Sequence, residues 1–186
     1  MAQIFRGGGA DGFMERPDLS PYRVLVLGTK PYGLHILCSV LAVAGVGRVI
    51  RVSDAGRALE LLKKEQFNAV FCDQRAQTVN GRSFIVAARC TSTQNRMIPV
   101  FVLQERARRS DVERARDTGA TDILTTPISP KTIARKLWAA IQKPRPFILA
   151  DEFFGPDRRS KARAIYRGRD RRKRSVRKVK IDFAYI

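Results

Sequence analysis

The sequence has few of the residues that most often carry catalysis or bind metals. Its one histidine, His35, lies in an apolar helical pattern, where we expect a packed side chain rather than a general acid or base. Three cysteines, Cys38, Cys72 and Cys90, form no CxxC pair, which argues against a zinc cluster and a disulfide framework. We therefore expect no metal and no enzyme activity, and we interpret the cysteines as small core residues in a reducing cytoplasm.

Long apolar runs are also missing. No stretch of about 18 apolar residues exists, and the first 20 residues lack the apolar centre of a signal peptide. The sequence thus predicts a soluble, unexported protein without membrane insertion.

Acidic residues are scarce relative to basic ones. The 186 residues include 36 Lys plus Arg against 17 Asp plus Glu, a formal net charge of +19. A charge of this size indicates an anionic partner, such as nucleic acid, a nucleotide or a membrane surface. The segment 157–180 is the most basic and is too poor in apolar residues to fold alone, so we expect it to stay disordered until a ligand neutralises it.

What the sequence does have is a regular alternation of strand and helix patterns. Short apolar runs, typical of strands buried on both faces, occur at 23–27, 48–52, 69–72, 99–103 and 122–124. Apolar residues at helical spacing follow each run. Ser53 or Asp54 is expected to cap the second helix, a Ser110–Glu113 capping box the fourth, and Ser129 the fifth.

This alternation predicts an α/β fold, a doubly wound five-stranded parallel sheet covering 22–143. A flexible Gly-rich segment, 1–21, precedes it, and an arginine-rich tail, 144–186, follows it. Ligands of such sheets bind beyond the carboxyl ends of the strands. At those ends the chain places Gly28, Thr29, Lys30, Asp73, Gln104, Glu105 and the segment 125–127.

With these positions the chain resembles the receiver domain of response regulators, the CheY-like family. The resemblance is carried by Asp73, Gly81, Pro99, the pair Gly119-Ala120, and Pro127. It implies that Asp73 corresponds to the aspartate that accepts a phosphoryl group. It further implies two acidic residues after the first strand, a Ser or Thr after the fourth, and a Lys before the last proline.

Those helper residues are absent here. The corresponding positions hold Gly28, Thr29, Gln104 and Thr126. A divalent cation that neutralises a phosphoryl group needs several oxygen ligands, and of these positions only Asp73 supplies a carboxylate. We interpret Asp73 as a vestigial phosphoacceptor or as a partner of Lys30. A response regulator that depends on phosphorylation of Asp73 is the alternative.

The tail repeats one short phrase. Residues 153–159 read FFGPDRR and residues 166–172 read YRGRDRR, so an aromatic, a Gly, an Asp and an Arg pair recur in order. An Arg fork matches the O6 and N7 acceptors of guanine, a carboxylate matches its N–H edge, and aromatic rings stack on bases. The candidate ligand residues are Asp157, Arg158, Arg159, Tyr166, Arg167, Arg169, Asp170, Arg171 and Arg172.

A CheY-like domain followed by such a segment resembles the Cle proteins, the CheY-like cyclic di-GMP effectors. The resemblance implies that the tail binds cyclic di-GMP and that the domain then docks on a protein partner, either the flagellar motor switch or surface-attachment machinery. The alternative is a nucleic-acid-binding protein, in which the tail binds RNA or DNA through counterion release.

Three features of the tail bear on its structure. Residues 147–150 are expected to pack on the domain or begin a strand, and Phe153 and Phe154 either anchor the tail or help to bind the ligand. Alternating apolar residues predict a strand within 176–186, which would add to a sheet edge of this protein or of a partner.

Overall fold

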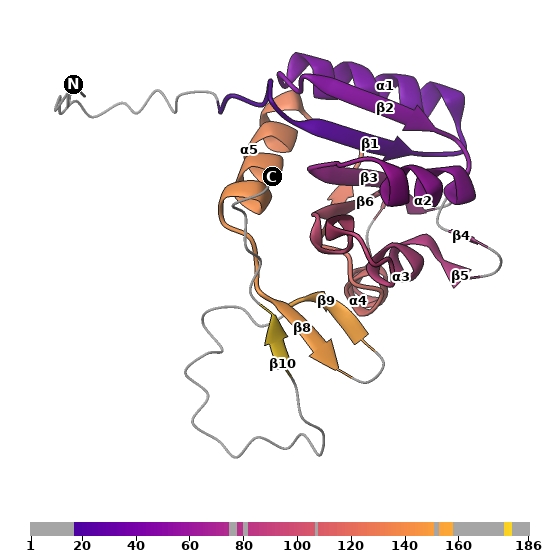
Figure 1. The fold of residues 1–186 in the computed structure, drawn as a ribbon. Coiled ribbons are helices and arrows are strands. Elements are labelled where there is room, and N and C mark those ends of the chain that lie inside the picture. Colours follow the sequence, from indigo (N-terminus) through magenta and orange to yellow (C-terminus); the bar gives the residue numbers. More distant parts are fainter. Residues whose placement is uncertain are drawn as a thin grey trace, which may run out of the picture.

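A computed structural model describes residues 17–74, 78–79, 82–106, 108–150, 153–157 and 177–179 (Figure 1). Five parallel strands form the main sheet in the order β2-β1-β3-β6-β7. They are β1 (Arg23–Leu27), β2 (Arg48–Val52), β3 (Ala69–Asp73), β6 (Val100–Gln104) and β7 (Asp122–Thr125). The predicted doubly wound α/β fold is confirmed.

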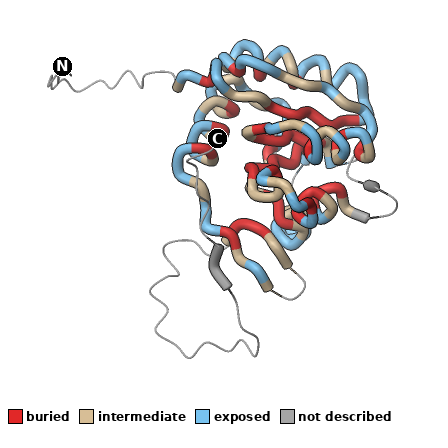
Figure 2. The backbone as a smooth tube through the Cα atoms, viewed as in Figure 1, coloured by how far each residue is buried: buried red, intermediate tan, exposed pale blue. Residues whose placement is uncertain are grey.

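Helices cover both faces of this sheet. They are α1 (Pro31–Val43), α2 (Ala55–Lys64), α3 (Phe84–Arg89), α4 (Arg109–Asp117) and α5 (Pro130–Gln142), with a 3₁₀ turn, η2 (Gln94–Met97), after α3. Side chains of α1 and α5 pack on one face, and side chains of α2, α3 and α4 pack on the other. Figure 2 shows the buried central strands between helices whose outer sides are exposed. In the part of the chain that the structure describes, no helix is long and apolar enough to cross a membrane.

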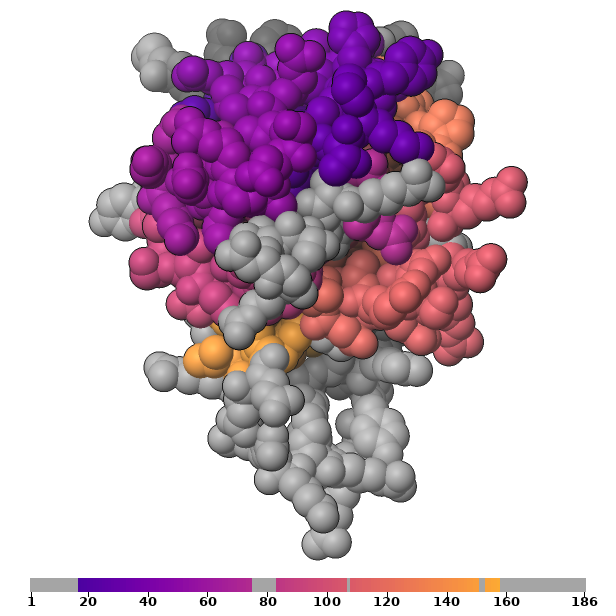
Figure 3. All heavy atoms as spheres, turned by 90° about the vertical axis from the view of Figure 1, so that its right-hand side faces the viewer, coloured from indigo at the N-terminus to yellow at the C-terminus, as the bar shows by residue number. Residues whose placement is uncertain are grey.

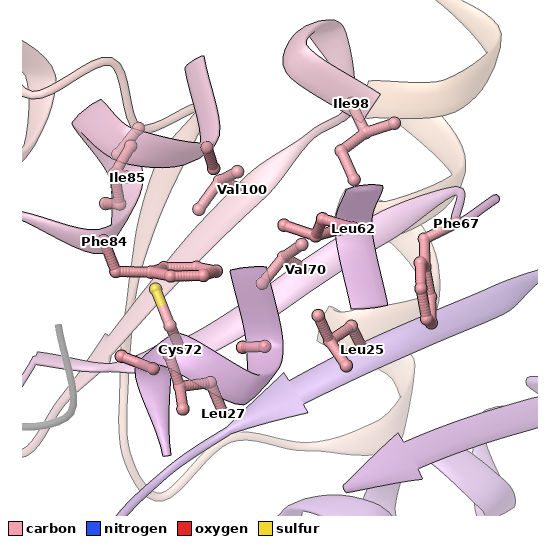
Figure 4. Close-up of a cluster of buried hydrophobic side chains, with 14 of the residues drawn as sticks. Leu25, Leu27, Leu62, Phe67, Val70, Cys72, Phe84, Ile85, Ile98 and Val100 are labelled. Atoms are coloured by element: carbon pink, nitrogen blue, oxygen red, sulfur yellow. The ribbon is translucent and has the colours of Figure 1, made fainter. Parts of the chain in front are cut away.

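The core explains why the strands are continuous apolar runs. In β1, Leu25 and Leu27 point to the side of α2 and α3, whereas Val24 and Val26 point to the side of α1 and α5. All four are buried, because successive side chains of a strand alternate between two covered faces. On the α2 and α3 side, the ring of Phe84 lies beside the sulfur of Cys72 (Figure 4).

Two of the three predicted helix caps are present. Asp54 accepts a hydrogen bond from the Arg57 N–H at 2.7 Å, and Ser129 accepts one from the Thr132 N–H at 3.2 Å. The predicted Ser110–Glu113 box is wrong, because α4 already begins at Arg109.

The carboxylate of Asp111 caps α4 instead. It accepts the Arg108 N–H at 3.0 Å, and that hydrogen bond, together with one from Arg114, lowers the pKa of the Asp111 carboxyl group. An ionised acceptor stabilises a free amide more than a neutral hydroxyl does, which explains why the carboxylate caps the helix where a serine was expected.

A second, antiparallel sheet follows α5. It contains β8 (Phe147–Ala150), β9 (Phe153–Pro156) and β10 (Arg177–Val179) in the order β10-β8-β9. The expectation that 147–150 begins a strand is confirmed, and β10 pairs with β8 of this same chain. The remainder of the strand predicted over 176–186 lies outside the described residues.

A short antiparallel pair precedes α3. Strands β4 (Thr78–Val79) and β5 (Arg82–Ser83) flank positions 80 and 81, where the sequence predicts a turn.

The histidine and two of the cysteines are less buried than the sequence predicts. His35 is exposed, and of the cysteines only Cys72 is buried, while Cys38 is half-buried and Cys90 is exposed. The prediction for His35 is wrong because α1 carries apolar residues on its outer side as well, including Tyr32, which is 77% exposed. Apolar neighbours along the sequence therefore do not place a residue of this helix in the core.

Candidate functional site

A cavity of about 640 Å³ lies at the carboxyl edge of the main sheet. Figure 3 looks onto this edge, with indigo residues of α1 and the loop before it above and salmon residues of α4 and its flanking loops below. The cavity brings together residues that the sequence placed at the strand ends: Gly28, Lys30, Asp73, Gln104, Glu105, Thr126 and Pro127. The prediction that these positions meet is confirmed.

Charges of both signs line this cavity. Asp73 is half-buried at the end of β3, and Lys30 Nζ lies 3.7 Å from Glu105 Oε1. Both side chains of that pair are exposed, so solvent screens it and it adds little stability. Arg106 and Arg108 supply two further cations.

Leu34 lies where an acidic side chain would enter from position 28. A Cβ atom on Gly28 would lie 2.9 Å from Leu34 Cδ2 and 3.7 Å from the Cβ of Asp73. Gly28 therefore allows the leucine to pack directly against the end of β1. An aspartate at position 28 would have to displace this leucine before it could reach a metal beside Asp73.

The available oxygen donors do not fit a magnesium ion. Mg²⁺ prefers octahedral coordination by oxygen, and the carboxylates that line the cavity are Asp73 and the ion-paired Glu105. Among the described residues, no group of three or more His, Cys, Asp or Glu side chains could hold a metal ion.

Gln104 occupies the position where the resemblance implies a hydroxyl group. Its side chain is 7% exposed, and its buried Nε2 has no hydrogen-bond partner in the described structure. An unsatisfied buried donor costs about 1–3 kcal/mol. The sheet edge thus contains a polar group that the fold itself does not satisfy.

Sequence reasoning missed the apolar wall of the cavity. The wall is formed by Leu27, Leu34, Leu37, Val40, Leu103 and Ile128. The helical pattern marked the α1 residues as apolar, but periodicity does not tell which of the core residues also border a cavity at the sheet edge.

A second feature fixes the start of the arginine-rich tail. The β8–β9 hairpin lies beside α3 (Figure 1) and packs against Arg89, the last residue of that helix, which is 2% exposed. The Arg89 guanidinium donates to the carbonyl oxygens of Gly119, Arg96 and Ile98 at 2.7 to 3.1 Å, and its Cζ lies 5.0 Å from the Phe147 ring centre. Burial lowers the pKa of Arg89 to about 9, which leaves it protonated at neutral pH.

The first copy of the repeated phrase takes part in this contact. Phe154 packs its ring on Phe147 at 5.2 Å, and the Arg96 Cζ lies 4.0 Å from the Phe154 ring centre. Gly155 and Pro156 are both buried. The expectation that the aromatic residues anchor the tail root is confirmed for Phe154. Gly155 contacts the receiver domain, since an added Cβ atom would lie 2.9 Å from the Cα of Gly119.

Asp157 is the one predicted ligand residue of the tail that the structure describes. It is half-buried, and its N–H donates to the Pro146 carbonyl oxygen at 2.7 Å. The other predicted ligand residues, Arg158, Arg159, Tyr166, Arg167, Arg169, Asp170, Arg171 and Arg172, lie outside the described residues.

Comparison with known proteins identifies a family for the part of the chain that forms the main sheet and its helices. Residues 24–137 match the response regulator receiver domain. No curated protein matches the chain. The family match ends before β8 begins at Phe147, so the hairpin and the tail lie outside it.

Solved receiver structures share the fold at low sequence identity. The receiver domain of sensor histidine kinase PA1611 from Pseudomonas aeruginosa, solved with magnesium in its active-site cleft, is 23% identical with a TM-score of 0.58; the match covers 66% of this chain and 98% of that one. Chemotaxis response regulator CheY4 of Vibrio cholerae is 24% identical with a TM-score of 0.55, covering 63% of this chain and 96% of that one.

Proposed function

The chain belongs to the response regulator receiver family, and we propose that it acts in signalling as a non-enzymatic cyclic di-GMP effector. In this proposal the arginine-rich tail binds the dinucleotide. The receiver domain then docks on a protein partner, and the resemblance to Cle proteins suggests the flagellar motor switch or surface-attachment machinery.

The anchored first copy of the repeat is the observation that carries the proposal. Strand β9 packs on the receiver domain where Gly155 meets Gly119, and Asp157 extends the hairpin through its hydrogen bond to Pro146. Arg158 and Arg159 follow directly in the sequence. A fixed starting point lowers the entropy lost when the arginine pair closes on a ligand. Two such pairs, in 153–159 and 166–172, match the two guanines of the dinucleotide.

The altered sheet edge supports the same proposal. Leu34 packs beside Gly28, and Gln104 and Thr126 replace the hydroxyl and ammonium groups that the family resemblance implies. A receiver with this edge lacks most of the groups that stabilise a transferred phosphoryl group. A second input site then has to supply the signal, and the tail is the segment with suitable chemistry.

Calorimetric titration of the full chain tests the proposal. We expect cyclic di-GMP to bind at least tenfold more tightly than GMP or cyclic di-AMP, and alanine at Arg158, Arg159, Arg171 and Arg172 to abolish this preference. A matched variant with alanine at the exposed Arg57, Arg109, Arg116 and Arg135 loses the same charge and should keep it. Tighter binding of random oligonucleotides than of the dinucleotide, with a steep salt dependence, would instead identify a nucleic-acid-binding protein.

A phosphorylation-dependent response regulator is the second candidate. The observation in its favour is that Asp73 ends β3 at the cavity, where the family resemblance places the acceptor. Incubation with acetyl phosphate and magnesium tests it. Stable label on the wild type that is lost in Asp73→Asn would identify this candidate as the function.

A further inference from the structure

We propose that the cavity at the carboxyl edge of the main sheet binds a small organic anion with an apolar body and a carboxylate or phosphate head. This site is formed by residues of the receiver domain, and the inference does not depend on cyclic di-GMP binding. It also differs from a phosphorylation site, because it would hold a whole molecule against apolar walls.

The size and walls of the cavity carry the first part of the argument. Ligand pockets for small molecules typically measure about 300–1,000 Å³ and are lined mainly by apolar side chains. This cavity measures about 640 Å³, and apolar side chains of α1 line it together with Leu103 and Ile128. Leu34, Val40 and Ile128 are only half-buried in the free protein. An apolar ligand body would remove these side chains from water.

The cations at the cavity select an anionic head. Lys30, Arg106 and Arg108 line it against Asp73 and Glu105, and Lys30 already lies 3.7 Å from Glu105. Arg106 is exposed, and the charge of Arg108 also helps to lower the pKa of the Asp111 carboxyl group. A guanidinium group matches carboxylate and phosphate oxygens through paired hydrogen bonds.

Gln104 points to the same ligand independently. Its side chain is more than nine-tenths buried, lines the cavity, and has an Nε2 donor without a partner among the described residues. Folded proteins satisfy nearly all such groups, so an unpartnered amide at a cavity wall indicates a missing acceptor. An oxygen of the ligand head would supply that acceptor.

Three eight-carbon probes test the inference on the full chain: octanoate, octyl phosphate and octanol. We expect octanoate or octyl phosphate to bind at least tenfold more tightly than octanol, with the largest NMR shifts at the amides of Gly33 and Gln104. The stronger of the two anions identifies the head group. Equal binding of all three probes, or no binding at millimolar concentration, would overturn the proposal.

Substitutions at Gly33 place the binding in the cavity. A Cβ atom on Gly33 has no neighbour nearer than 3.9 Å, so Gly33→Leu fills cavity space while improving helix propensity. We expect Gly33→Leu to weaken anion binding at least tenfold and Gly33→Ala to change it less than threefold. Replacing Arg106 and Arg108 by Gln should weaken octanoate binding about tenfold and leave octanol binding unchanged. Unchanged anion binding in Gly33→Leu would assign the anions to the tail and contradict the proposal.

Discussion

Gly119 and Gly155 pack backbone against backbone. A Cβ atom on Gly155 would lie 2.9 Å from the Cα of Gly119, and a Cβ atom on Gly119 would lie 3.0 Å from the Phe154 carbonyl oxygen. Gly119 also has φ +95°, which side chains other than glycine rarely adopt. Because Gly119 belongs to the receiver domain and Gly155 to the hairpin, this contact fixes where the tail leaves the domain.

Gly155→Ala should detach the hairpin. The added methyl group meets the Gly119 Cα and the Phe153 ring, and overpacking of this kind costs about 1–3 kcal/mol. We expect the Asp157 amide to exchange its hydrogen at least tenfold faster while the amides of β3 stay protected. Hydrogen-exchange NMR measures both.

Gly33→Ala is the matched control for that experiment. Its methyl group meets nothing nearer than 3.9 Å within α1, so unfolding free energy should rise by about 0.5–1 kcal/mol. The Asp157 amide donates to Pro146 within the hairpin, so unchanged Asp157 exchange in Gly155→Ala would show that the two-glycine contact does not stabilise the hairpin.

Arg89→Met should destabilise the whole domain. The guanidinium satisfies three buried carbonyl oxygens, and methionine leaves them without donors at a cost of at least about 3 kcal/mol. Arg89→Lys should recover less than half of this loss, since one ammonium group does not reproduce the planar fork. Urea unfolding measures both variants, and a loss below about 1 kcal/mol in Arg89→Met would contradict the structural role.

Most of the main fold follows from local sequence patterns. A strand covered on both faces must be apolar throughout, so runs such as the one at 23–27 predict β1 with its observed bounds. The start of α4 was predicted wrongly because Ser110 and Asp111 each offer a side-chain acceptor for a different helix start, and the helix begins where Asp111 accepts the Arg108 N–H. Local patterns leave such a choice open.

The candidate site was predictable only in part. Topology brings Asp73 and Gln104 to one sheet edge, which the sequence predicts once the strands are placed. Two contacts were not predictable. The contact of Leu34 with the end of β1 depends on the exact position of α1, and the contact of Arg89 with Phe147 joins segments far apart in the chain. An isolated Arg inside a short helix pattern gives no signal that its charge is buried.

Gln104→Leu should stabilise the ligand-free protein. Removing a buried amide whose Nε2 has no partner in the described structure raises unfolding free energy by about 1 kcal/mol, because the two side chains have similar volumes. Thr121→Val is a useful contrast, since it removes a hydroxyl that accepts the Val100 N–H at 3.0 Å and should destabilise the protein. Thermal unfolding measures the difference, and a loss of stability in Gln104→Leu would mean that the amide has a partner in solution.

The three cysteines should differ in reactivity. Burial raises the pKa of Cys72 to about 12 and also raises the pKa of the half-buried Cys38 thiol. Only the thiolate reacts, so at pH 8 to 9 iodoacetamide should label the exposed Cys90 first, Cys38 slowly and Cys72 at least a hundredfold more slowly than Cys90. Mass spectrometry locates the label, and all three should react at similar rates in guanidinium chloride. Rapid native labelling of Cys72 would contradict its burial beneath α3.

Rebuilding the sheet edge together with space for its new side chains should increase phosphorylation of Asp73. Acidic residues after β1, a hydroxyl group after β6 and an ammonium group after β7 are supplied by Gly28→Asp, Thr29→Asp, Gln104→Thr and Thr126→Lys. Because Leu34 packs where the position 28 side chain would enter, we expect these four changes to give little label from acetyl phosphate and magnesium, and severalfold more when Leu34→Ala is added. Asp73→Asn should abolish the label, which intact-protein mass spectrometry quantifies. Equal labelling with and without Leu34→Ala would show that the leucine moves aside readily. The missing polar groups alone would then limit phosphorylation at this edge.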